Sequence, residues 1–474
     1  MRERTIRELA ALAGAAPVDS DRPVGPDVVI DSRLATPGAV FVALPGEHVD
    51  GHDFVGAAAA RGAAAAICTR VTDAPLVHLV VGDALAGLGA LATGVVAQAK
   101  ASGLACIGVT GSSGKTSTKD LLGQVLAASA PTVSPQGSFN NEIGVPLTAL
   151  RIDAATRYLV SELGARGAGH IAELCRIVPP DVGMVLNVGH AHLGEFGSVA
   201  GIAAAKGELV EALPADGWAV LNADDPLVLG MAPRTAARLA TFSLAGEPDD
   251  GELRVWAEDI EPDALQRHAF TLRSAGVAAA AVPVRLQGPG RHQVANALAA
   301  ATAALALGLP PGPVAAALSA ATAQSRWRMQ LSERPDGVLI VNDAYNANPD
   351  SMRAALTTVA GMRRPGGRLL AVLGDMLELG DDGPAEHREL GLLAARLGFE
   401  VVALGGFAEA IADGVRAAGG RVRVVVDRAQ AVAVAGADLQ ASDVVVVKAS
   451  RGLALDTVAD ALASGRGFEA GEPA

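Results

Sequence analysis

The sequence predicts an α/β protein built from three domains. Its 474 residues leave room for roughly three units of about 150 residues each. Hydrophobic residues make up 50% of the chain and charged residues 19%, which favours large folded cores over disorder. From residue 104 onward, apolar strands alternate with amphipathic helices, a pattern typical of parallel sheets covered by helices on both faces.

The first predicted domain spans residues 1–102 and is a small α/β unit with a mixed sheet. A helix is expected over Phe54–Arg61, and a long alanine-rich helix opens at Asp83 and ends near Lys100. Short apolar runs between turn residues predict strands at Val28–Ile30, Val40–Leu44, Ala64–Cys68 and Val77–Val81.

The second predicted domain spans residues 103–325 and has a parallel sheet like that of P-loop ATPases. Towards its end, Arg254–Leu286 favours antiparallel strands, which we interpret as an insertion, and two alanine-rich helices follow. Strands are predicted at Leu104–Val109, Tyr158–Val160, Val182–Val188 and Trp218–Leu221, and helices at Lys115–Ser129, Gly167–Val178 and Val199–Leu213.

The third predicted domain spans residues 326–474 and is Rossmann-like, with Gln324–Arg328 as the interdomain link. Each strand candidate is followed by a helix-compatible segment, which predicts a second doubly wound sheet. The tail after Ser464 is rich in glycine and glutamate and is expected to fray. The strand candidates are Val338–Val341, Leu369–Leu373, Val401–Leu404, Val422–Val426 and Val444–Val447.

Composition restricts the partners and the compartment. A net charge of −13 argues against nonspecific binding to nucleic acid or to an anionic membrane. The charged first ten residues lack the apolar core of a secretion signal, and no uncharged stretch predicts a membrane span. Cys68, Cys106 and Cys175 lie far apart, which favours buried free thiols in a reducing compartment. We therefore expect a cytoplasmic protein without nucleic-acid or membrane partners, and nothing requires more than a monomer.

The strongest functional signal is a phosphate-binding loop at Gly108–Ser117, between a predicted strand and a predicted helix. It departs from a strict Walker A motif, because valine occupies position 109. Backbone N–H groups of such a loop bind phosphates, while Lys115 reaches the β/γ-phosphates and the Thr116 hydroxyl coordinates Mg²⁺. The loop alone does not distinguish a kinase, GTPase, ATPase or ligase. The predicted nucleotide-binding residues are Gly111, Ser112, Ser113, Gly114, Lys115, Thr116 and Ser117.

Two side chains near strand ends are candidate metal ligands. Glu162 lies just past the strand at 158–160, and His192 follows the strand that ends at Val188. Ligands of parallel sheets bind at the carboxyl ends of the strands, so both side chains are placed to reach a metal near the loop. Taken singly, a residue of either type is more often a surface or helix-capping residue than a metal ligand.

Lys206 has two interpretations. It lies on a predicted helix, where a lysine is commonly a solvated surface residue. However, only five of the 38 Lys and Arg residues are lysines, and a desolvated neutral amine reacts with CO₂ to form a carbamate, which arginine does not. A carbamylated lysine is an anionic, oxygen-rich ligand suited to Mg²⁺. The sequence leaves both interpretations open.

A turn rich in amide side chains, Asn342–Pro349, lies between a strand and a helix of the third domain. Asn348-Pro349 predicts a helix start. The same side chains offer hydrogen-bonding groups to a nucleotide base or ribose, and the residues alone favour neither role.

Together these motifs resemble the Mur ligase family, and within it the MurF type, over almost the whole chain. One position departs from the family pattern, because Ala449 replaces a glycine. In chain order the matching segments are Asp31–Arg33 with Gly46 and Asp50–Phe54, Thr110–Thr116, Asn140–Pro146, Ala191–Leu193, Ala205–Leu209, Asn296, Arg328–Gln330, Asp343–Pro349, Leu373–Gly380 and Val447–Arg451.

The resemblance implies a role for each domain. The N-terminal domain would hold the UDP-sugar end of the substrate, the central domain ATP and two Mg²⁺ ions, and the C-terminal domain the dipeptide while it closes over ATP. The implied catalytic residues are Lys115, Glu162, His192 and Lys206. Thr116 and Glu162 would ligate one Mg²⁺, and His192 with carbamylated Lys206 the second. The implied ATP contacts are Asn296, Arg328, Asp343, Tyr345 and Asn346, and the implied substrate contacts are Asp31, Ser32, Arg33, Asn140, Asn141, Lys448, Ser450 and Arg451.

The implied reaction is the ATP-dependent, ADP-forming ligation of D-alanyl-D-alanine (D-Ala-D-Ala) to UDP-N-acetylmuramoyl-tripeptide (UDP-MurNAc-tripeptide) in peptidoglycan synthesis, through an acyl phosphate. One alternative is a sister amide ligase of the MurE or folylpolyglutamate synthetase type, against which the 343–349 and 374–380 segments argue. The other is a non-catalytic P-loop regulator, against which Glu162, His192 and Lys206 argue, because such a protein needs no second metal site. The sequence does not indicate the third residue of the tripeptide.

Overall fold

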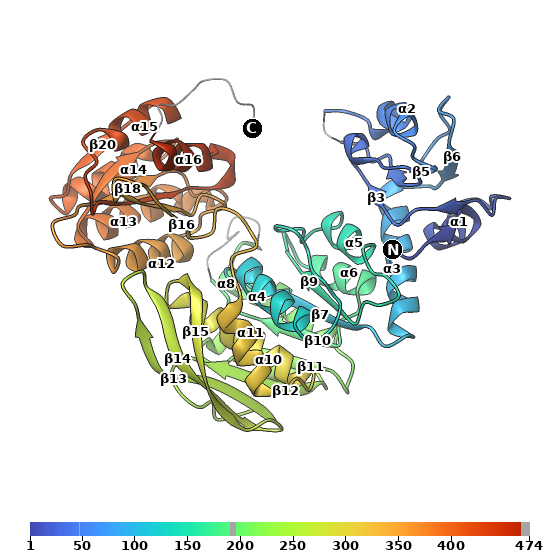
Figure 1. The fold of residues 1–474 in the computed structure, drawn as a ribbon, viewed down its shortest axis with the longest axis horizontal. Helices are drawn as coiled ribbons and strands as arrows, with labels where there is room; N and C mark the ends of the chain where they lie inside the picture. Colours follow the sequence, from blue (N-terminus) through green and yellow to red (C-terminus); the bar gives the residue numbers. More distant parts are fainter. Residues whose placement is uncertain (47, 190–195, 466–474) are drawn as a thin grey trace.

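The computed structural model describes residues 1–46, 48–189 and 196–465. Within these ranges, three α/β units contain sheets of four, nine and six strands, and a two-stranded ribbon lies near the N-terminus. Figure 1 shows the central unit between the N-terminal and C-terminal units, which lie on either side of it. The three-domain α/β architecture predicted from the sequence is confirmed.

The sheet of the N-terminal unit is parallel throughout, so the predicted mixed sheet is wrong. Each strand pairs in parallel with the next in the order β3-β4-β5-β6, because helical or irregular crossovers rather than hairpins connect them. The strands are β3 (Val28–Val29), β4 (Val40–Val42), β5 (Ala65–Cys68) and β6 (Val77–Val80), with the ribbon β1 (Arg4–Thr5) and β2 (Pro23–Val24). The helices are α1 (Ile6–Ala13), η1 (Ser32–Leu34), η2 (Gly51–Phe54), α2 (Val55–Ala60) and α3 (Ala84–Lys100).

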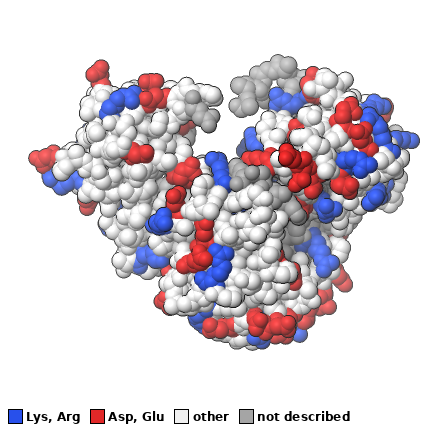
Figure 2. All heavy atoms as spheres, turned by 180° about the vertical axis from the view of Figure 1, so that it is seen from behind, with Lys and Arg blue, Asp and Glu red and all other residues white. Residues whose placement is uncertain are grey.

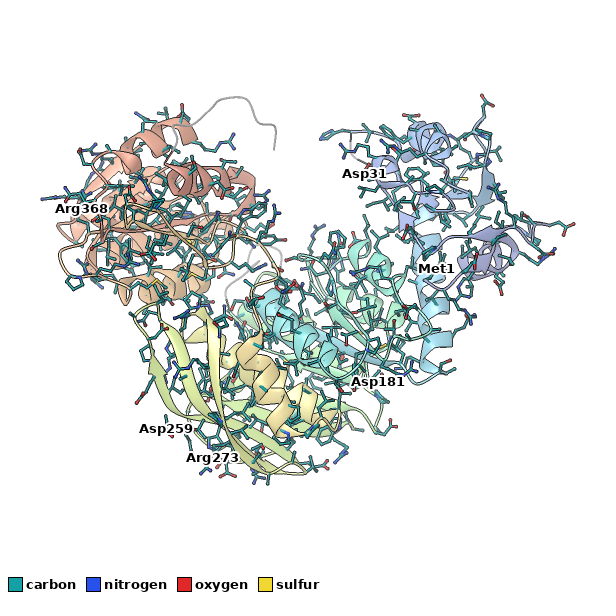
Figure 3. All side chains as sticks on the ribbon, in the orientation of Figure 1. Met1, Asp31, Asp181, Asp259, Arg273 and Arg368 are labelled. Atoms are coloured by element: carbon teal, nitrogen blue, oxygen red, sulfur yellow. The ribbon has the colours of Figure 1, made fainter. Side chains whose placement is uncertain are left out.

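Helix α3 joins the N-terminal unit to the central unit. The Asp83 side chain accepts a hydrogen bond from the backbone N–H of Ala86 and caps the helix start, as predicted. At the other end, Lys100 Nζ lies 2.7 Å from Asp181 Oδ1 of the central unit, where Figure 3 labels Asp181. One continuous hydrophobic cluster includes Leu91 of α3 and Leu174 of the central unit. Apolar packing therefore holds these two units together.

The central sheet has the strand order β15-β14-β13-β12-β11-β10-β7-β9-β8. All pairs from β8 to β13 are parallel, whereas β13, β14 and β15 form antiparallel pairs. The antiparallel strands therefore continue the sheet and are not a separate insertion, which corrects the sequence-based interpretation. The strands are β7 (Ala105–Thr110), β8 (Thr132–Val133), β9 (Tyr158–Glu162), β10 (Val182–Val185), β11 (Trp218–Asn222), β12 (Arg238–Ser243), β13 (Leu253–Pro262), β14 (Arg267–Gly276) and β15 (Ala280–Pro289).

Helices cover both faces of the central sheet. One hydrophobic cluster contains Leu122 and Leu298, from the phosphate-loop helix α4 and the alanine-rich helix α10, and the opposite cluster contains Leu174 and Leu209 from α6 and α8. The helices are α4 (Lys115–Ala127), α5 (Gly144–Ala149), α6 (His170–Ile177), α8 (Val199–Glu211), α9 (Pro226–Leu229), η3 (Ala232–Arg234), α10 (His292–Ala306) and α11 (Pro311–Ala320).

The C-terminal unit has the strand order β16-β17-β21-β18-β19-β20. Only the β16–β17 pair is antiparallel, and separate hydrophobic clusters lie on its two faces, as expected for a doubly wound sheet. The predicted frayed tail mostly lies outside the described residues. The strands are β16 (Gln330–Glu333), β17 (Leu339–Asn342), β18 (Leu369–Leu373), β19 (Phe399–Ala403), β20 (Val422–Val424) and β21 (Val444–Lys448). The helices are α12 (Pro349–Ala360), η4 (Gly380–Asp382), α13 (Gly383–Arg396), α14 (Ala408–Ala417), α15 (Arg428–Gly436), η5 (Arg451–Leu453) and α16 (Asp456–Ser464).

The central and C-terminal units are joined at the turn between β13 and β14 and at the linker after α11, among other contacts. The turn between β13 and β14 reaches α12, where Gln266 Nε2 donates to the carbonyl of Gly361 at 3.0 Å (Figure 1). The second connection is the linker after α11. In this linker Trp327 (φ 58°) and Met329 (φ 49°) adopt the left-handed conformation, which is uncommon for bulky residues. The backbone therefore turns sharply on both sides of Arg328.

The surface carries charged side chains and the core holds the cysteines, as the sequence pattern predicts. Figure 2 shows acidic and basic side chains interspersed on the visible face. Cys68, Cys106 and Cys175 are free and buried, as predicted. In the part of the chain that the structure describes, no helix is long and apolar enough to cross a membrane.

Candidate active site

A cleft of about 760 Å³ lies where the central unit faces the C-terminal unit. It brings together most of the residues that the sequence predicts to be functional, although they are far apart in the chain. Those lining it are Ser112, Ser113, Gly114, Lys115, Thr116, Ser117, Asn140, Asn141, Glu162, Lys206, Asn296, Arg328, Asp343, Tyr345, Asn346, Lys448, Ser450 and Arg451.

The phosphate loop connects β7 to α4 and leaves the start of that helix without a side-chain cap. Gly114 has φ +81°, and a Cβ at this position would lie 2.6 Å from Asn296 Oδ1, so glycine is required there. No side chain caps the start of α4, which leaves the N–H groups of its first turn available to an anion. Lys115 Nζ donates to the carbonyl of Gly111 at 2.6 Å, and burial lowers the pKa of this amine.

Glu162 is the last residue of β9, and its side chain lies against the phosphate loop. It is 1% exposed, and its carboxylate accepts hydrogen bonds from Thr116 Oγ1 at 2.9 Å and from Asn140 Nδ2 at 2.8 Å. The Thr116 hydroxyl also lies 2.9 Å from Ser138 Oγ. Asn140 thus orients the carboxylate in this structure, and two oxygen donors of the kind that Mg²⁺ prefers lie side by side.

Arg328 connects the linker to the phosphate loop. Its Nη2 donates to Thr116 Oγ1 at 2.8 Å and to Ser138 Oγ at 3.1 Å. Its Cζ lies 4.2 Å from the centre of the Tyr345 ring, in a cation–π contact. Arg328 therefore brings a positive charge from the interdomain linker to the Thr116 hydroxyl.

The turn after β17 is held by a buried ion pair. Lys448 Nζ lies 2.7 Å from Asp343 Oδ2 and donates to the carbonyl of Asn346 at 2.8 Å. The other carboxylate oxygen of Asp343 accepts from the backbone N–H of Met329 at 2.9 Å. Asn348 caps α12 in a capping box with Ser351, so the predicted helix start is confirmed.

Ser450 and Arg451 lie at the same edge of the C-terminal sheet. The Ser450 hydroxyl accepts a hydrogen bond from the backbone N–H of Leu377 at 3.0 Å. The Arg451 guanidinium stacks over the Trp327 ring at 4.2 Å and forms an ion pair with Asp456. These contacts fix the backbone of the segment that carries Ala449.

Lys206 is buried on α8 at the wall of the cleft. It is 6% exposed and makes no hydrogen bond or ion pair with another described residue. Burial, together with the charge of Lys115, lowers the pKa of its amine to about 7. The neutral amine is therefore well populated near neutral pH, so the solvated-surface interpretation does not hold. His192, the predicted neighbouring ligand, lies outside the described residues.

Three predicted substrate residues lie away from this cleft, on the N-terminal unit. Figure 3 labels Asp31 there. Asp31 accepts hydrogen bonds from the side chain and backbone N–H of Arg33, which lower the pKa of its carboxyl to about 2. Ser32 is buried beside it. Neither these residues nor Gly111 line the cleft. Asn141 does line it, and its side chain accepts a hydrogen bond from the backbone N–H of Gly144 at the start of α5.

The cleft also contains residues that were not predicted, among them Ser138, Asn187 and His292. Ser138 contacts both Thr116 and Arg328. The Asn187 side chain accepts from the backbone N–H of Ser113 at 2.9 Å and so shapes the loop. His292 begins α10 and lines the cleft, and burial lowers its pKa. Asn187 lies near the carboxyl end of the predicted strand Val182–Val188 and could have been found on that ground, whereas Ser138 and His292 carry no local signal.

The fold and the site define a nucleotide-dependent enzyme of the P-loop class. A phosphate loop, two cations, a buried carboxylate and a buried amine converge between two α/β units. Family models match in three consecutive segments. The Mur ligase family catalytic domain matches residues 27–101, the Mur ligase middle domain residues 109–304, and the Mur ligase glutamate ligase domain residues 327–451.

Relatives and solved structures agree with these models. The UDP-N-acetylmuramoyl-tripeptide–D-alanyl-D-alanine ligase of Mycobacterium tuberculosis is 45% identical over 98% of both chains. The ligase of the same name from Escherichia coli is 38% identical over 79% of this chain and 80% of its own. The chain belongs to the Mur ligase family.

Among solved structures, MurF from Acinetobacter baumannii matches with a TM-score of 0.85 and 32% identity, over 98% of this chain and 99% of that chain. MurF from Thermotoga maritima in complex with ADP matches with a TM-score of 0.77 and 29% identity, over 93% and 97%. These relatives are of the MurF type, so the resemblance drawn from the motifs is confirmed. A folylpolyglutamate synthase from M. tuberculosis shares the fold at 19% identity and a TM-score of 0.60.

Proposed function

We propose that this chain is an ADP-forming ligase of the MurF type, which joins D-Ala-D-Ala to UDP-MurNAc-tripeptide. The product is the UDP-MurNAc-pentapeptide used in peptidoglycan synthesis. The observation that carries the proposal is the 45% identity over 98% of the chain to a ligase of that name. The cleft supports it, because it combines phosphate-binding groups with a buried carboxylate and a buried amine.

The reaction requires an activated carboxylate, because a free carboxylate is a poor acyl donor. An oxygen of the terminal carboxylate of the tripeptide attacks the γ-phosphorus of ATP, and ADP leaves. The amine of the dipeptide then attacks the acyl carbon, inorganic phosphate leaves, and the amine loses a proton. Phosphoryl transfer between two anions needs fixed positive groups around the phosphate. Lys115 and the free N–H groups at the start of α4 supply them on one side, and Arg328 supplies one from the linker.

The residues around Thr116 fit a magnesium ion. The Thr116 hydroxyl and the Glu162 carboxylate are hard oxygen donors 2.9 Å apart, with Asn140 orienting the carboxylate. Among the described residues no cluster of three His, Cys, Asp or Glu side chains forms, so phosphate oxygens would complete the coordination. Bound there, Mg²⁺ would offset the charge on the transferred phosphoryl group.

A second ion would require the carbamate of Lys206. The buried neutral amine attacks the carbon of CO₂, a nitrogen–carbon bond forms, and a proton leaves the nitrogen. The product places two anionic oxygens at the wall of the cleft, where the parent amine has no described partner. His192 would be the other ligand from the protein. The charge of Lys115 beside the buried amine supports this role, because the carbamate replaces a second positive charge there with a negative one.

The remaining assignments follow the order of the domains. Residues 1–102, with Asp31, Ser32 and Arg33, hold the UDP-sugar end of the substrate. Residues 103–325 bind ATP, and residues 326–474 admit the dipeptide near Lys448, Ser450 and Arg451 and close over the nucleotide, with Asn296, Asp343, Tyr345 and Asn346 contacting ATP. We place the protein in the cytoplasm, because its buried free thiols suit a reducing compartment. We also propose that it acts as a monomer.

Purified protein with ATP, Mg²⁺, UDP-MurNAc-tripeptide and D-Ala-D-Ala tests the proposal. Phosphate release should match pentapeptide formation, followed by mass spectrometry, with tripeptides ending in lysine and in diaminopimelate compared. The matched control is Lys115→Ala, which removes the phosphate-binding amine and leaves the loop backbone in place. If neither phosphate nor pentapeptide forms, the proposal fails. Nucleotide binding without turnover on any amine would favour a regulator.

A further inference from the structure

A buried ion pair lies on the phosphate-loop helix but outside the cleft. Lys119 is 1% exposed on α4, and its Nζ lies 2.5 Å from Oδ1 of its neighbour Asp120, whose side chain is 10% exposed. Neither residue lines the cleft. Burying two charges carries a desolvation penalty, and consecutive helix residues do not normally face each other. The pair therefore requires an explanation other than nucleotide binding.

The pair fixes the start of the linker to the C-terminal unit. Asp120 Oδ2 accepts a hydrogen bond from the backbone N–H of Ser325 at 3.1 Å. One turn further along α4, the Gln124 side chain exchanges two hydrogen bonds with the backbone of Thr322, at 2.9 and 3.0 Å. The segment 322–325 is thereby tied to the phosphate-loop helix immediately before the chain turns towards Arg328.

The same pair fixes a second segment that ends at Thr116. Lys119 Nζ donates to the carbonyl of Pro135 at 2.5 Å. Three residues later, Ser138 Oγ contacts both the Thr116 hydroxyl and the Arg328 guanidinium. Two chain segments are therefore held by the ion pair, one at Pro135 and one at Ser325. Both continue to a residue that contacts the Thr116 hydroxyl, Ser138 in the first and Arg328 in the second.

The linker between these points has a strained backbone. Trp327 and Met329 both have positive φ, on either side of Arg328. Such conformations persist only where the surrounding structure holds them. Met329 is held from the C-terminal side by Asp343, and Ser325 is held from the central side by Asp120. The position of Arg328 is thus set by one anchor in each unit.

We propose that Lys119 and Asp120 are positioning residues, which anchor the interdomain linker to the phosphate-loop helix and so set the approach of Arg328 to the nucleotide. The anchor acts when the C-terminal unit closes. The predicted effect of the anchor on turnover rests on the proposed function. Closure of the C-terminal unit over bound nucleotide, however, can be measured without any ligation.

Closure can be followed by energy transfer between two dyes. Val277 of the central unit and Val426 of the C-terminal unit are 55% and 88% exposed, so Val277→Cys and Val426→Cys provide labelling sites. The native thiols are buried, and burial raises the pKa of Cys106 and of Cys175 to about 12, which protects them from the dyes. The probe ligand is a non-hydrolysable ATP analogue with Mg²⁺.

The test compares Asp120→Ala and Asp120→Asn with a matched control, Asp443→Ala. Asp443 is likewise a buried carboxylate, paired with Arg368 and accepting backbone N–H bonds, but it lies within the C-terminal unit.

Asp120→Ala should reduce the closure signal and lower kcat on the order of 10- to 100-fold, because small displacements of groups around the reacting atoms cost rates of this size. The dissociation constant of the analogue should change by no more than about threefold. This is well under the tenfold change that corresponds to about 1.4 kcal/mol of binding free energy. Asp120→Asn keeps an oxygen for the Ser325 N–H and should show a smaller effect of the same sign.

When Asp120→Ala folds, either of two results would overturn the proposed anchoring role of Asp120. One is a closure signal and kcat for Asp120→Ala equal to those of the parent. The other is an equal reduction in Asp443→Ala, since the effect would then reflect general destabilisation. If Asp120→Ala does not fold, Asp120→Asn decides, and parent-like closure in that variant refutes the inference. A protein that closes on nucleotide but ligates nothing would contradict the proposed function while leaving the anchor testable.

Discussion

Replacing Lys206 with methionine isolates the free-energy cost of burying its amine. Burial lowers the pKa of Lys206 from the ordinary value of 10.5 to about 7. Between these values the folded protein binds fewer protons than the unfolded chain, so this residue makes the folded state more stable as the pH rises. Below about pH 7 the amine is charged in both states and the full penalty applies. The difference in pKa corresponds to ~5 kcal/mol at about 1.4 kcal/mol per pH unit.

Methionine is unbranched like lysine, shorter by one heavy atom, and has no charge. In CO₂-free buffer, Lys206→Met should therefore be more stable than the parent by several kcal/mol near pH 6, and the difference should vanish towards pH 10.5. Hydrogen exchange of α8 in the two proteins at matched pH measures this difference in the free energy of opening. A difference that does not change with pH would refute the burial penalty on which the carbamate proposal depends.

Carbamylation itself is visible in the same pair of proteins. With ¹³C-labelled bicarbonate at pH 8, the parent should show a carbamate signal by NMR, and the signal should disappear in Lys206→Met. The chain has only five lysines, so the assignment is simple. Bicarbonate should also stabilise the parent and not the variant, because a ligand that binds only the folded state adds to its stability. A signal that survives in the variant would place the carbamate elsewhere.

Three further substitutions follow from the packing. Gly114→Ala should weaken ATP binding by tenfold or more, because the new Cβ would lie 2.6 Å from Asn296 Oδ1 at φ +81°, and parent-like affinity by calorimetry would contradict this. Glu162→Gln should lower kcat on the order of 100-fold while thermal stability changes little, and an unchanged Mg²⁺ dependence would count against the carboxylate as a ligand. Gly391→Ala should destabilise the C-terminal unit by about 3 kcal/mol, measured by hydrogen exchange of α13, because its Cβ would collide with the carbonyl of Ile411.

The residues with a local sequence signal lie together in the cleft, as expected from the motifs that contain them. The phosphate loop needs glycine, lysine and threonine at fixed spacing, so Gly114, Lys115 and Thr116 were identified without tertiary information. Glu162 was identified because the carboxyl end of a parallel strand is a ligand-binding edge. The long helix after Asp83 was placed correctly, because a capping residue begins it and a lysine ends it. Helix α1 was missed, although the capping box of Thr5 and Glu8 was available in the sequence.

Features that depend on long-range packing were not predicted. The antiparallel strands after residue 253 look the same in sequence whether they form an insertion or extend the central sheet, and only the pairing of β12 with β13 decides. The parallel order of the N-terminal sheet likewise depends on crossover geometry. Ser138 has no local motif, and its role arises only where Thr116 and Arg328 meet it. Lys119 pairs with Asp120, its neighbour in the sequence, but the pair is buried because the loop at Pro135 and the linker at Ser325 pack over α4.

The choice of amine donor tests the central claim most directly. Purified protein, ATP and Mg²⁺ would be supplied with UDP-MurNAc-tripeptide and an equimolar mixture of D-Ala-D-Ala, diaminopimelate, lysine and glutamate, and the product masses recorded. We predict one product, the pentapeptide, with one phosphate released per product. Addition of a single amino acid, or no product despite ATP binding, would contradict the assignment to a D-Ala-D-Ala-adding ligase.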